Sequence, residues 1–115
     1  MITKQETTCR DLCGLNISPL LLAKLNLFRA DFGKPMVVSS GARCPTVNKK
    51  AGGRSGSAHL QGRAVDFVRT PELVAFCTEE NLAKHGLYME HPDYTSTWLH
   101  LCDRPPPSGR RIFIP

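Results

Sequence analysis

Ser57-Ala-His59-Leu-Gln-Gly62-Arg-Ala64-Val-Asp66 joins a loop to a strand and carries a histidine and an aspartate seven residues apart. β-Branched and aromatic residues gather in Ala64–Val68, which predicts a strand there, with Asp66 on one of its faces. His59 precedes this strand on a loop rich in glycine and serine, and Gly62 allows that loop to turn sharply. The sequence therefore predicts an imidazole and a carboxylate that converge on one point.

A second histidine lies on a strand that is predicted further along the chain, at Thr97–Cys102. Strand alternation places His100 on one face and turns the leucines on either side of it toward a core. Two strands of one sheet can then bring His100 beside Asp66. Together with His59 they form a ligand set that suits zinc, and a catalytic zinc needs three protein ligands and an open position.

These residues match the pattern of a known family. The runs Ser57-x-His59-x-x-Gly62-x-Ala64-x-Asp66 and Trp98-x-His100 resemble the zinc D-Ala-D-Ala carboxypeptidase-like peptidases, a group that includes bacterial DD-carboxypeptidases, vancomycin-resistance dipeptidases and phage endolysins. The upstream run 39–48 is similar to another segment of that family. The resemblance covers roughly residues 17–115, and the hedgehog signalling domain shares the fold.

The resemblance implies an α+β fold of the hedgehog/DD-peptidase type, with a small antiparallel sheet flanked by helices. It also implies one Zn²⁺ per chain, held by His59, Asp66 and His100. The length of 115 residues fits one small domain. We therefore expect a single zinc peptidase domain over residues 1–115, with a lead-in segment at 1–16.

Helices and strands are expected outside the two runs as well, in the order of an α+β domain. Ser18 and Pro19 are typical of a helix start and Gly33 of a helix end. The apolar stripe of this helix consists of Leu21, Leu25, Phe28 and Phe32. A second helix is expected from Thr70 to about Gly86. Strands are expected at 36–40, 87–89 and 111–115, and a short helix at 46–51.

Composition and charge limit the classes of protein to which this chain can belong. Hydrophobic residues make up 41% of the chain, and no apolar run approaches the ~20 residues that a membrane span needs. The net charge of +5 favours acidic partners. Because the charges are scattered, without a basic stripe interleaved with aromatic residues, nucleic-acid binding is not expected. Attraction to a polyanionic cell wall and plain solubility remain the two interpretations of this charge.

The chain has five cysteines, an odd number that cannot pair completely within one chain, at Cys9, Cys13, Cys44, Cys77 and Cys102. We expect buried thiols in a reducing compartment. Cys102 shares its predicted strand face with His100. It is either a further zinc ligand or, as we favour, a small buried residue that packs.

The resemblance also points to residues on the substrate side of the site. The family arginine that matches Arg43 lies near the active site and helps to hold a substrate carbonyl or carboxylate, whereas the alternative role is to anchor its loop. Ser57 either bonds the substrate or caps its local turn. Trp98 either walls the substrate cleft or fills core volume.

Hydrolysis of an amide needs a base that takes a proton from water and returns it to the leaving amine. Glu90 is our candidate, because it follows a predicted strand upstream of His100. Family glutamates often precede the last histidine by fewer residues, and Thr97 occupies the position three before it here. His91 and Asp93, in the same connection as Glu90, are the alternatives.

The resemblance implies a peptidase that acts on peptidoglycan stem peptides or cross-links, as a carboxypeptidase or an endopeptidase. The polar N-terminus lacks an apolar signal region, so we expect synthesis in the cytoplasm and action on the wall after delivery, or as part of a phage virion. The competing hypothesis is a zinc-containing module on the same fold that binds the wall or is structural, without catalysis.

Overall fold

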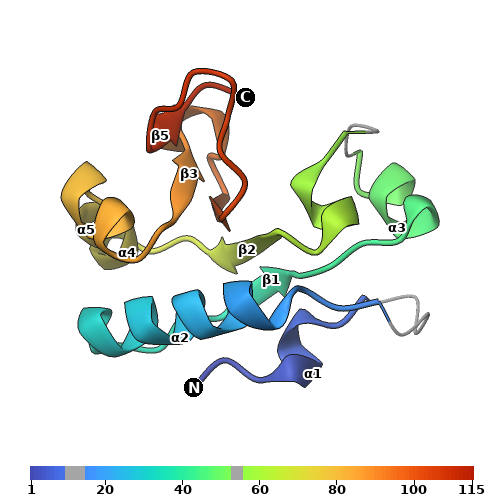
Figure 1. Cartoon of the computed structure of the whole chain (residues 1–115), viewed down its shortest axis with the longest axis horizontal. Helices are drawn as coiled ribbons and strands as arrows, with labels where there is room; N and C mark the ends of the chain where they lie inside the picture. Colours follow the sequence, from blue (N-terminus) through green and yellow to red (C-terminus); the bar gives the residue numbers. More distant parts are fainter. Residues whose placement is uncertain (10–14, 53–55) are drawn as a thin grey trace.

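The computed structural model describes residues 1–9, 15–52 and 56–115. Its helices are α1 (Lys4–Thr7), α2 (Pro19–Phe32), α3 (Pro45–Lys50), α4 (Pro71–Phe76) and α5 (Glu79–Lys84), with 3₁₀ turns η1 (Ala58–Gln61) and η2 (Pro92–Tyr94). Its strands are β1 (Val38–Ser40), β2 (Ala64–Val68), β3 (Tyr88–Glu90), β4 (Trp98–Cys102) and β5 (Ile112–Phe113). The predicted α+β class is confirmed (Figure 1). Among these described ranges, no helix is long and apolar enough to cross a membrane.

β2 and β4 are neighbouring strands in the interior of the sheet. Within the described residues it has five strands in the order β1-β2-β4-β3-β5. β2 and β4 are antiparallel, and their register places Asp66 directly opposite His100. The expectation that one sheet brings these two residues together is therefore confirmed.

The sheet is antiparallel as predicted except at its last strand, which makes it mixed. β1, β2, β4 and β3 pair antiparallel, but β5 pairs parallel to β3, with Met89 opposite Ile112. β5 follows β4 in the chain and runs antiparallel to it. In the sheet, β3 lies between these two strands. The residue pattern of a strand predicts that the strand exists, but it does not predict which strand will pair with it.

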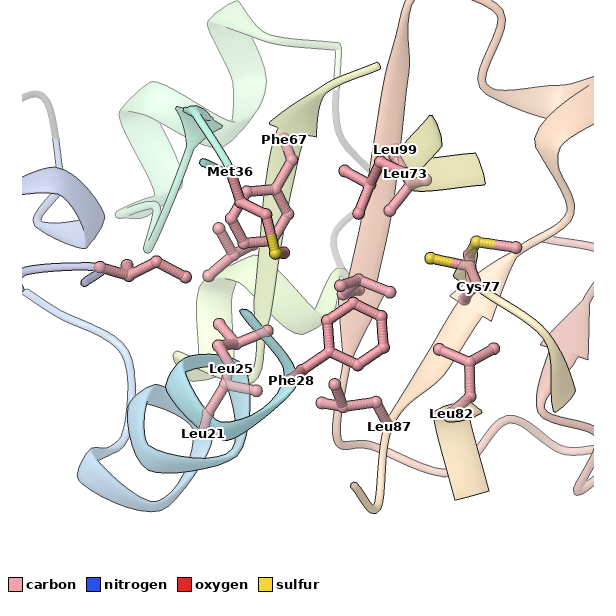
Figure 2. Close-up of a cluster of buried hydrophobic side chains, with 14 of the residues drawn as sticks. Leu21, Leu25, Phe28, Met36, Phe67, Leu73, Cys77, Leu82, Leu87 and Leu99 are labelled. Carbon is pink, nitrogen blue, oxygen red and sulfur yellow. The ribbon is translucent and has the colours of Figure 1, made fainter. Parts of the chain in front are cut away.

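The hydrophobic core lies between one face of the sheet and the helices. In α2 the Ser18 side chain accepts a hydrogen bond from the Leu21 N–H, and the helix ends at Gly33 in the left-handed conformation, as predicted. Leucines and phenylalanines of α2 pack against the core side of β2 and β4 (Figure 2); the fully buried members of this cluster include Leu21, Leu25, Phe28, Val65, Phe67, Leu99 and Leu101. The alternate residues of β2 and β4 consequently face the other side.

The second predicted helix is two helices, α4 and α5, so the prediction of one helix up to Gly86 is wrong in its middle. Thr78 has an extended backbone and its hydroxyl accepts a hydrogen bond from the Asn81 N–H at 3.1 Å. The Asn81 side chain donates to the Phe76 carbonyl at 2.8 Å. Threonine and asparagine thus start a new helix instead of continuing the old one.

The lead-in segment contains α1, which the sequence did not predict. Thr3 and Glu6 form a capping box at its start. The Thr7 carbonyl at its end accepts a hydrogen bond from the Ala42 N–H at 2.9 Å. This contact brings α1 against the turn that follows β1, and a Cβ atom at Gly41 would overlap the backbone of Thr7.

We expect Gly41→Ala to lower the free energy of unfolding by about 1–3 kcal/mol, because its methyl group forces α1 and the turn apart. Gly56→Ala is the matched control, since nothing lies within 4 Å of a Cβ at that glycine. Urea denaturation of the two variants and the wild type measures the difference. Equal stability of Gly41→Ala and Gly56→Ala would show that α1 does not pack closely on this turn.

Candidate metal centre

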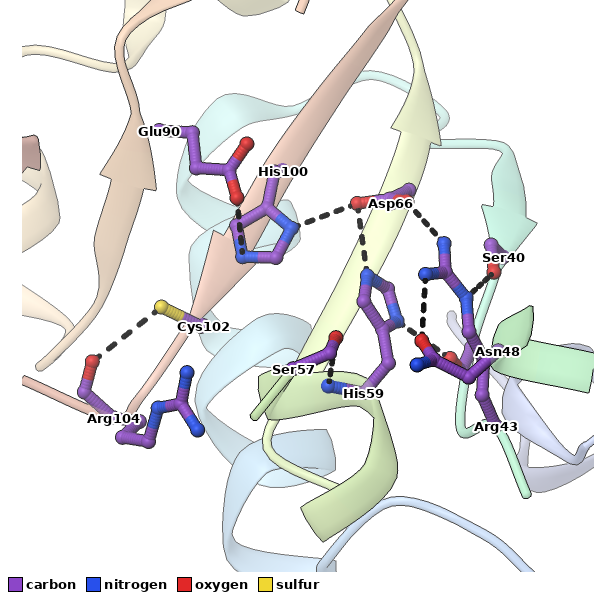
Figure 3. Close-up of polar contacts among 11 residues, drawn as sticks. Ser40, Arg43, Asn48, Ser57, His59, Asp66, Glu90, His100, Cys102 and Arg104 are labelled. Carbon is purple, nitrogen blue, oxygen red and sulfur yellow. Dashed lines mark hydrogen bonds and ion pairs between the residues drawn. The ribbon is translucent and has the colours of Figure 1, made fainter. Parts of the chain in front are cut away.

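Three buried side chains from three elements converge on the face of the sheet opposite the core. His59 comes from η1, Asp66 from β2 and His100 from β4, and each is at most 6% exposed. Each offers one ligand atom, and these atoms all lie within 4.8 Å of one another. Figure 3 shows both imidazole rings turned toward the Asp66 carboxylate. The structure thus brings together the three residues that the sequence suggested as metal ligands.

Local hydrogen bonds orient His59. The Ser57 side chain caps η1 by accepting from the His59 N–H at 3.2 Å, and Gly62 ends this turn with a φ of 67°. His59 Nδ1 lies 2.7 Å from the Gly41 carbonyl oxygen, which can only accept, so Nδ1 carries the hydrogen. In the neutral ring Nε2 therefore keeps its lone pair, and it lies 3.2 Å from Asp66 Oδ1.

Asp66 holds the group together through both of its oxygens. Oδ1 lies 3.2 Å from His59 Nε2 and 2.9 Å from His100 Nδ1. Oδ2 accepts a hydrogen bond from Arg43 Nη2 at 3.1 Å. Ligand atoms around a tetrahedral zinc, each ~2.0–2.1 Å from the ion, lie roughly 3.3 Å apart. The donor types and the observed spacing fit such an ion.

The charges of this group are strongly coupled. Burial by itself raises the pKa of Asp66, but its contacts with the His100 and His59 imidazoles hold that pKa well below its ordinary value. Burial likewise lowers the pKa of His100, but the Asp66 carboxylate outweighs it and the net shift of the pKa is upward. A buried ionised carboxylate between two imidazoles is an environment that favours a cation.

An open cavity of about 1270 Å³ adjoins this group, and it brings the predicted substrate-side residues together. Arg43, Ser57 and Trp98 all line it, as do the three candidate ligands. Glu90 lines it too, at the end of β3, and its Oε1 lies 3.8 Å from His100 Nε2.

The alternatives to Glu90 lie elsewhere. His91 and Asp93 are not among the residues that line the cavity, and their side chains lie 3.7 Å from each other with large exposed fractions of 42% and 83%. Thr97 lines a different hollow, next to Arg69. Glu90 is therefore the candidate base that the structure brings close to the three ligands.

The sequence model of the Peptidase M15 family matches residues 1–101. This chain belongs to the Peptidase M15 family. The match takes in all three candidate ligands and Glu90, and it starts at residue 1, so it includes the lead-in that the resemblance left out. A comparison with curated proteins gave no match. The membership confirms the resemblance to zinc D-Ala-D-Ala carboxypeptidase-like peptidases and makes this M15 chain a member of a metallopeptidase family.

Among the described cysteines of this M15 chain, Cys9, Cys77 and Cys102 are buried as expected, whereas Cys44 is half-buried. Cys102 is 2% exposed and packs with Ala58 and Ala64, and its thiol donates to the Arg104 carbonyl oxygen at 3.6 Å. Burial raises the pKa of the Cys77 thiol to about 12. Cys13 lies outside the described residues.

Sequence reasoning missed several residues that shape the M15 site. Gly41 orients His59 through its carbonyl group, and Asn48 accepts from Arg43 Nη1 at 3.4 Å. Arg104 and the wall formed by 105–107 and 113–115 line the cavity. A backbone carbonyl carries no sequence signal, but the run Pro105-Pro106-Pro107 beyond His100 did mark a rigid segment.

We expect Asp66→Asn to weaken zinc binding by more than the roughly 10–100-fold that the loss of a supporting partner causes, because it removes the negative charge from the centre of the group. Asp31→Asn is the control, since Asp31 bonds Lys84 and His85 instead. Competition of a chromophoric chelator for Zn²⁺ measures the affinity. Wild-type affinity in Asp66→Asn would exclude Asp66 as a ligand.

Proposed function

We propose that this M15 chain is a zinc-dependent peptidase that hydrolyses amide bonds in peptidoglycan stem peptides or cross-links. The observation that carries the proposal is the convergence of His59, Asp66 and His100 beside an open cavity that Glu90 also lines. A structural zinc site is closed by four protein ligands, whereas a catalytic site keeps one position open. Three ligand groups facing a cavity match the catalytic type.

The candidate ligands would bind the metal, and two neighbouring groups orient these ligands. His59 Nε2, Asp66 Oδ1 and His100 Nδ1 would hold the zinc ion. Bound there, zinc supplies Lewis-acid polarisation of a carbonyl group and lowers the pKa of water toward ~7. Arg43 fixes the carboxylate of Asp66 from the other side, and the Gly41 carbonyl fixes the ring of His59.

Glu90 is the proposed proton carrier. Its side chain is 22% exposed, and its carboxylate borders both the cavity and His100. From this position Glu90 can take a proton from the attacking water and give it to the leaving amine. Ser57 and Trp98 would contact the bound peptide, because both line the cavity.

The cavity and the charge support a polymeric, anionic substrate. A volume of about 1270 Å³ exceeds the ~300–1,000 Å³ of sites for small molecules, which suits several residues of a peptide. The net charge of +5 favours an anionic wall. We accordingly place its action at the cell wall, after delivery from the cytoplasm or as part of a phage virion.

We expect Glu90→Gln to lower kcat for wall hydrolysis by roughly 10²–10⁴-fold while zinc stays bound, because only proton transfer is removed. Glu80→Gln on α5 is the matched control, since Glu80 is exposed and does not line the cavity. Release of amino groups from purified peptidoglycan measures the rate. If both variants cleave at the wild-type rate, another residue is the base.

We expect a zinc chelator to stop wall hydrolysis and added Zn²⁺ to restore it, because Asp66 and the two histidines lose their shared ion. His59→Ala should behave like the chelated enzyme but stay inactive in excess Zn²⁺. Mass spectrometry of the released fragments then names the cleaved bond. Zinc bound at about one equivalent without hydrolysis of any wall type would favour the non-catalytic binding module.

A further inference from the structure

Arg43 and Arg104 both line the cavity, but they present their guanidinium groups differently. Each guanidinium nitrogen of Arg43 is already engaged, with Nε donating to Ser40 at 3.1 Å, Nη1 to Asn48 at 3.4 Å and Nη2 to Asp66 at 3.1 Å. Arg43 is also largely buried, with a 12% exposed side chain. The protein itself therefore uses one N–H group on each nitrogen of Arg43 and pairs its charge with Asp66.

The guanidinium group of Arg104 is engaged through one nitrogen. Nη1 donates to the Gly56 carbonyl at 2.7 Å and to the Gln61 side chain at 3.1 Å. Among residues 1–9, 15–52 and 56–115, Nε and Nη2 make no hydrogen bond, and no carboxylate lies within ion-pair distance of Arg104. Both of its acceptors are neutral, so its positive charge faces the cavity without compensation by the described part of the chain.

Arg104 lines the same cavity as the metal centre. His100 and Cys102 lie on β4, which ends at Cys102, and Arg104 lies in the bend that follows. One bound peptide can therefore contact both Arg104 and the candidate ligands. In Figure 3 Arg43 lies on the Asp66 side of His59, whereas Arg104 lies on the Cys102 side.

We propose that Arg104 binds a carboxylate of the peptide substrate and so selects peptides with a free acid close to the scissile bond. This inference rests on the proposed function. The fork of arginine matches a carboxylate, and the two uncommitted nitrogens Nε and Nη2 can donate side by side. Nη1, bonded to Gly56 and Gln61, holds the fork in place and reduces the entropy lost on binding. Arg104 lies beyond residues 1–101, so the family match does not assign it.

The carboxylate can belong to the C-terminus of the peptide or to an acidic residue within it. The test uses the stem pentapeptide L-Ala-D-γ-Glu-L-Lys-D-Ala-D-Ala in three forms: the free acid, the C-terminal amide and the α-amide of its glutamate. Calorimetric titration into zinc-loaded Glu90→Gln protein measures binding without cleavage. The double variants Glu90→Gln/Arg104→Gln and Glu90→Gln/Arg110→Gln are compared with it. Arg110 is the matched control, because it is exposed and does not line the cavity.

We expect one amide to bind about 10–100-fold more weakly than the free acid in Glu90→Gln and in the Arg110→Gln control. Arg104→Gln should bind the acid as weakly as that amide, and the form that shows the difference identifies the source of the carboxylate. An unchanged ratio of acid to amide affinity in Arg104→Gln, or no binding of any form, overturns the inference. Hydrolysis of the free acid by the wild type is measured separately. A protein that binds through Arg104 but cleaves nothing contradicts the proposed function alone.

Discussion

The carboxylate of Asp66 is the constraint on which the site depends. Taking an ion of this kind out of water costs several kcal/mol unless it is well paired, and Asp66 is only 6% exposed. Two imidazoles meet Oδ1 and the Arg43 guanidinium meets Oδ2, which offsets that cost. The contacts with the two imidazoles hold the pKa of Asp66 low, so it stays an acceptor. The contacts that pair the buried Asp66 carboxylate thus also form the candidate cation site.

The sheet register turns this local pairing into a defined geometry. Asp66 and His100 are direct partners across β2 and β4, so no flexible loop sets their distance. The alternate residues Val65, Phe67, Leu99 and Leu101 are buried in the core. A shift of one residue in that register would move the leucines to the cavity and His100 into the core. Hydrophobic burial therefore fixes the position of the polar group on the other face.

Short residue patterns predicted the helices and strands whose formation depends on residues close together in the sequence. The strand that carries Asp66 followed from its β-branched and aromatic residues, and the strand that carries His100 followed from alternation. α2 followed from its cap and its glycine. The sheet partner of β5 could not be predicted, because pairing is decided by the path of residues 103–111 over β3. The break at Thr78 was missed because a helix cap and a helix interior differ by a few side-chain hydrogen bonds.

The contacts of the two arginines show why motif matching alone misassigns roles at such a site. A motif identifies Arg43 as an arginine near the substrate, but the charge it must balance is the buried Asp66, 3.1 Å away. An arginine whose charge already compensates an internal carboxylate has no unpaired charge to offer a ligand. Among the described arginines that line the cavity, Arg104 is the one without a carboxylate partner, and it lies past the last matched residue at 101. Residues that prepare the metal centre and a residue that selects the peptide can therefore lie in different parts of the chain.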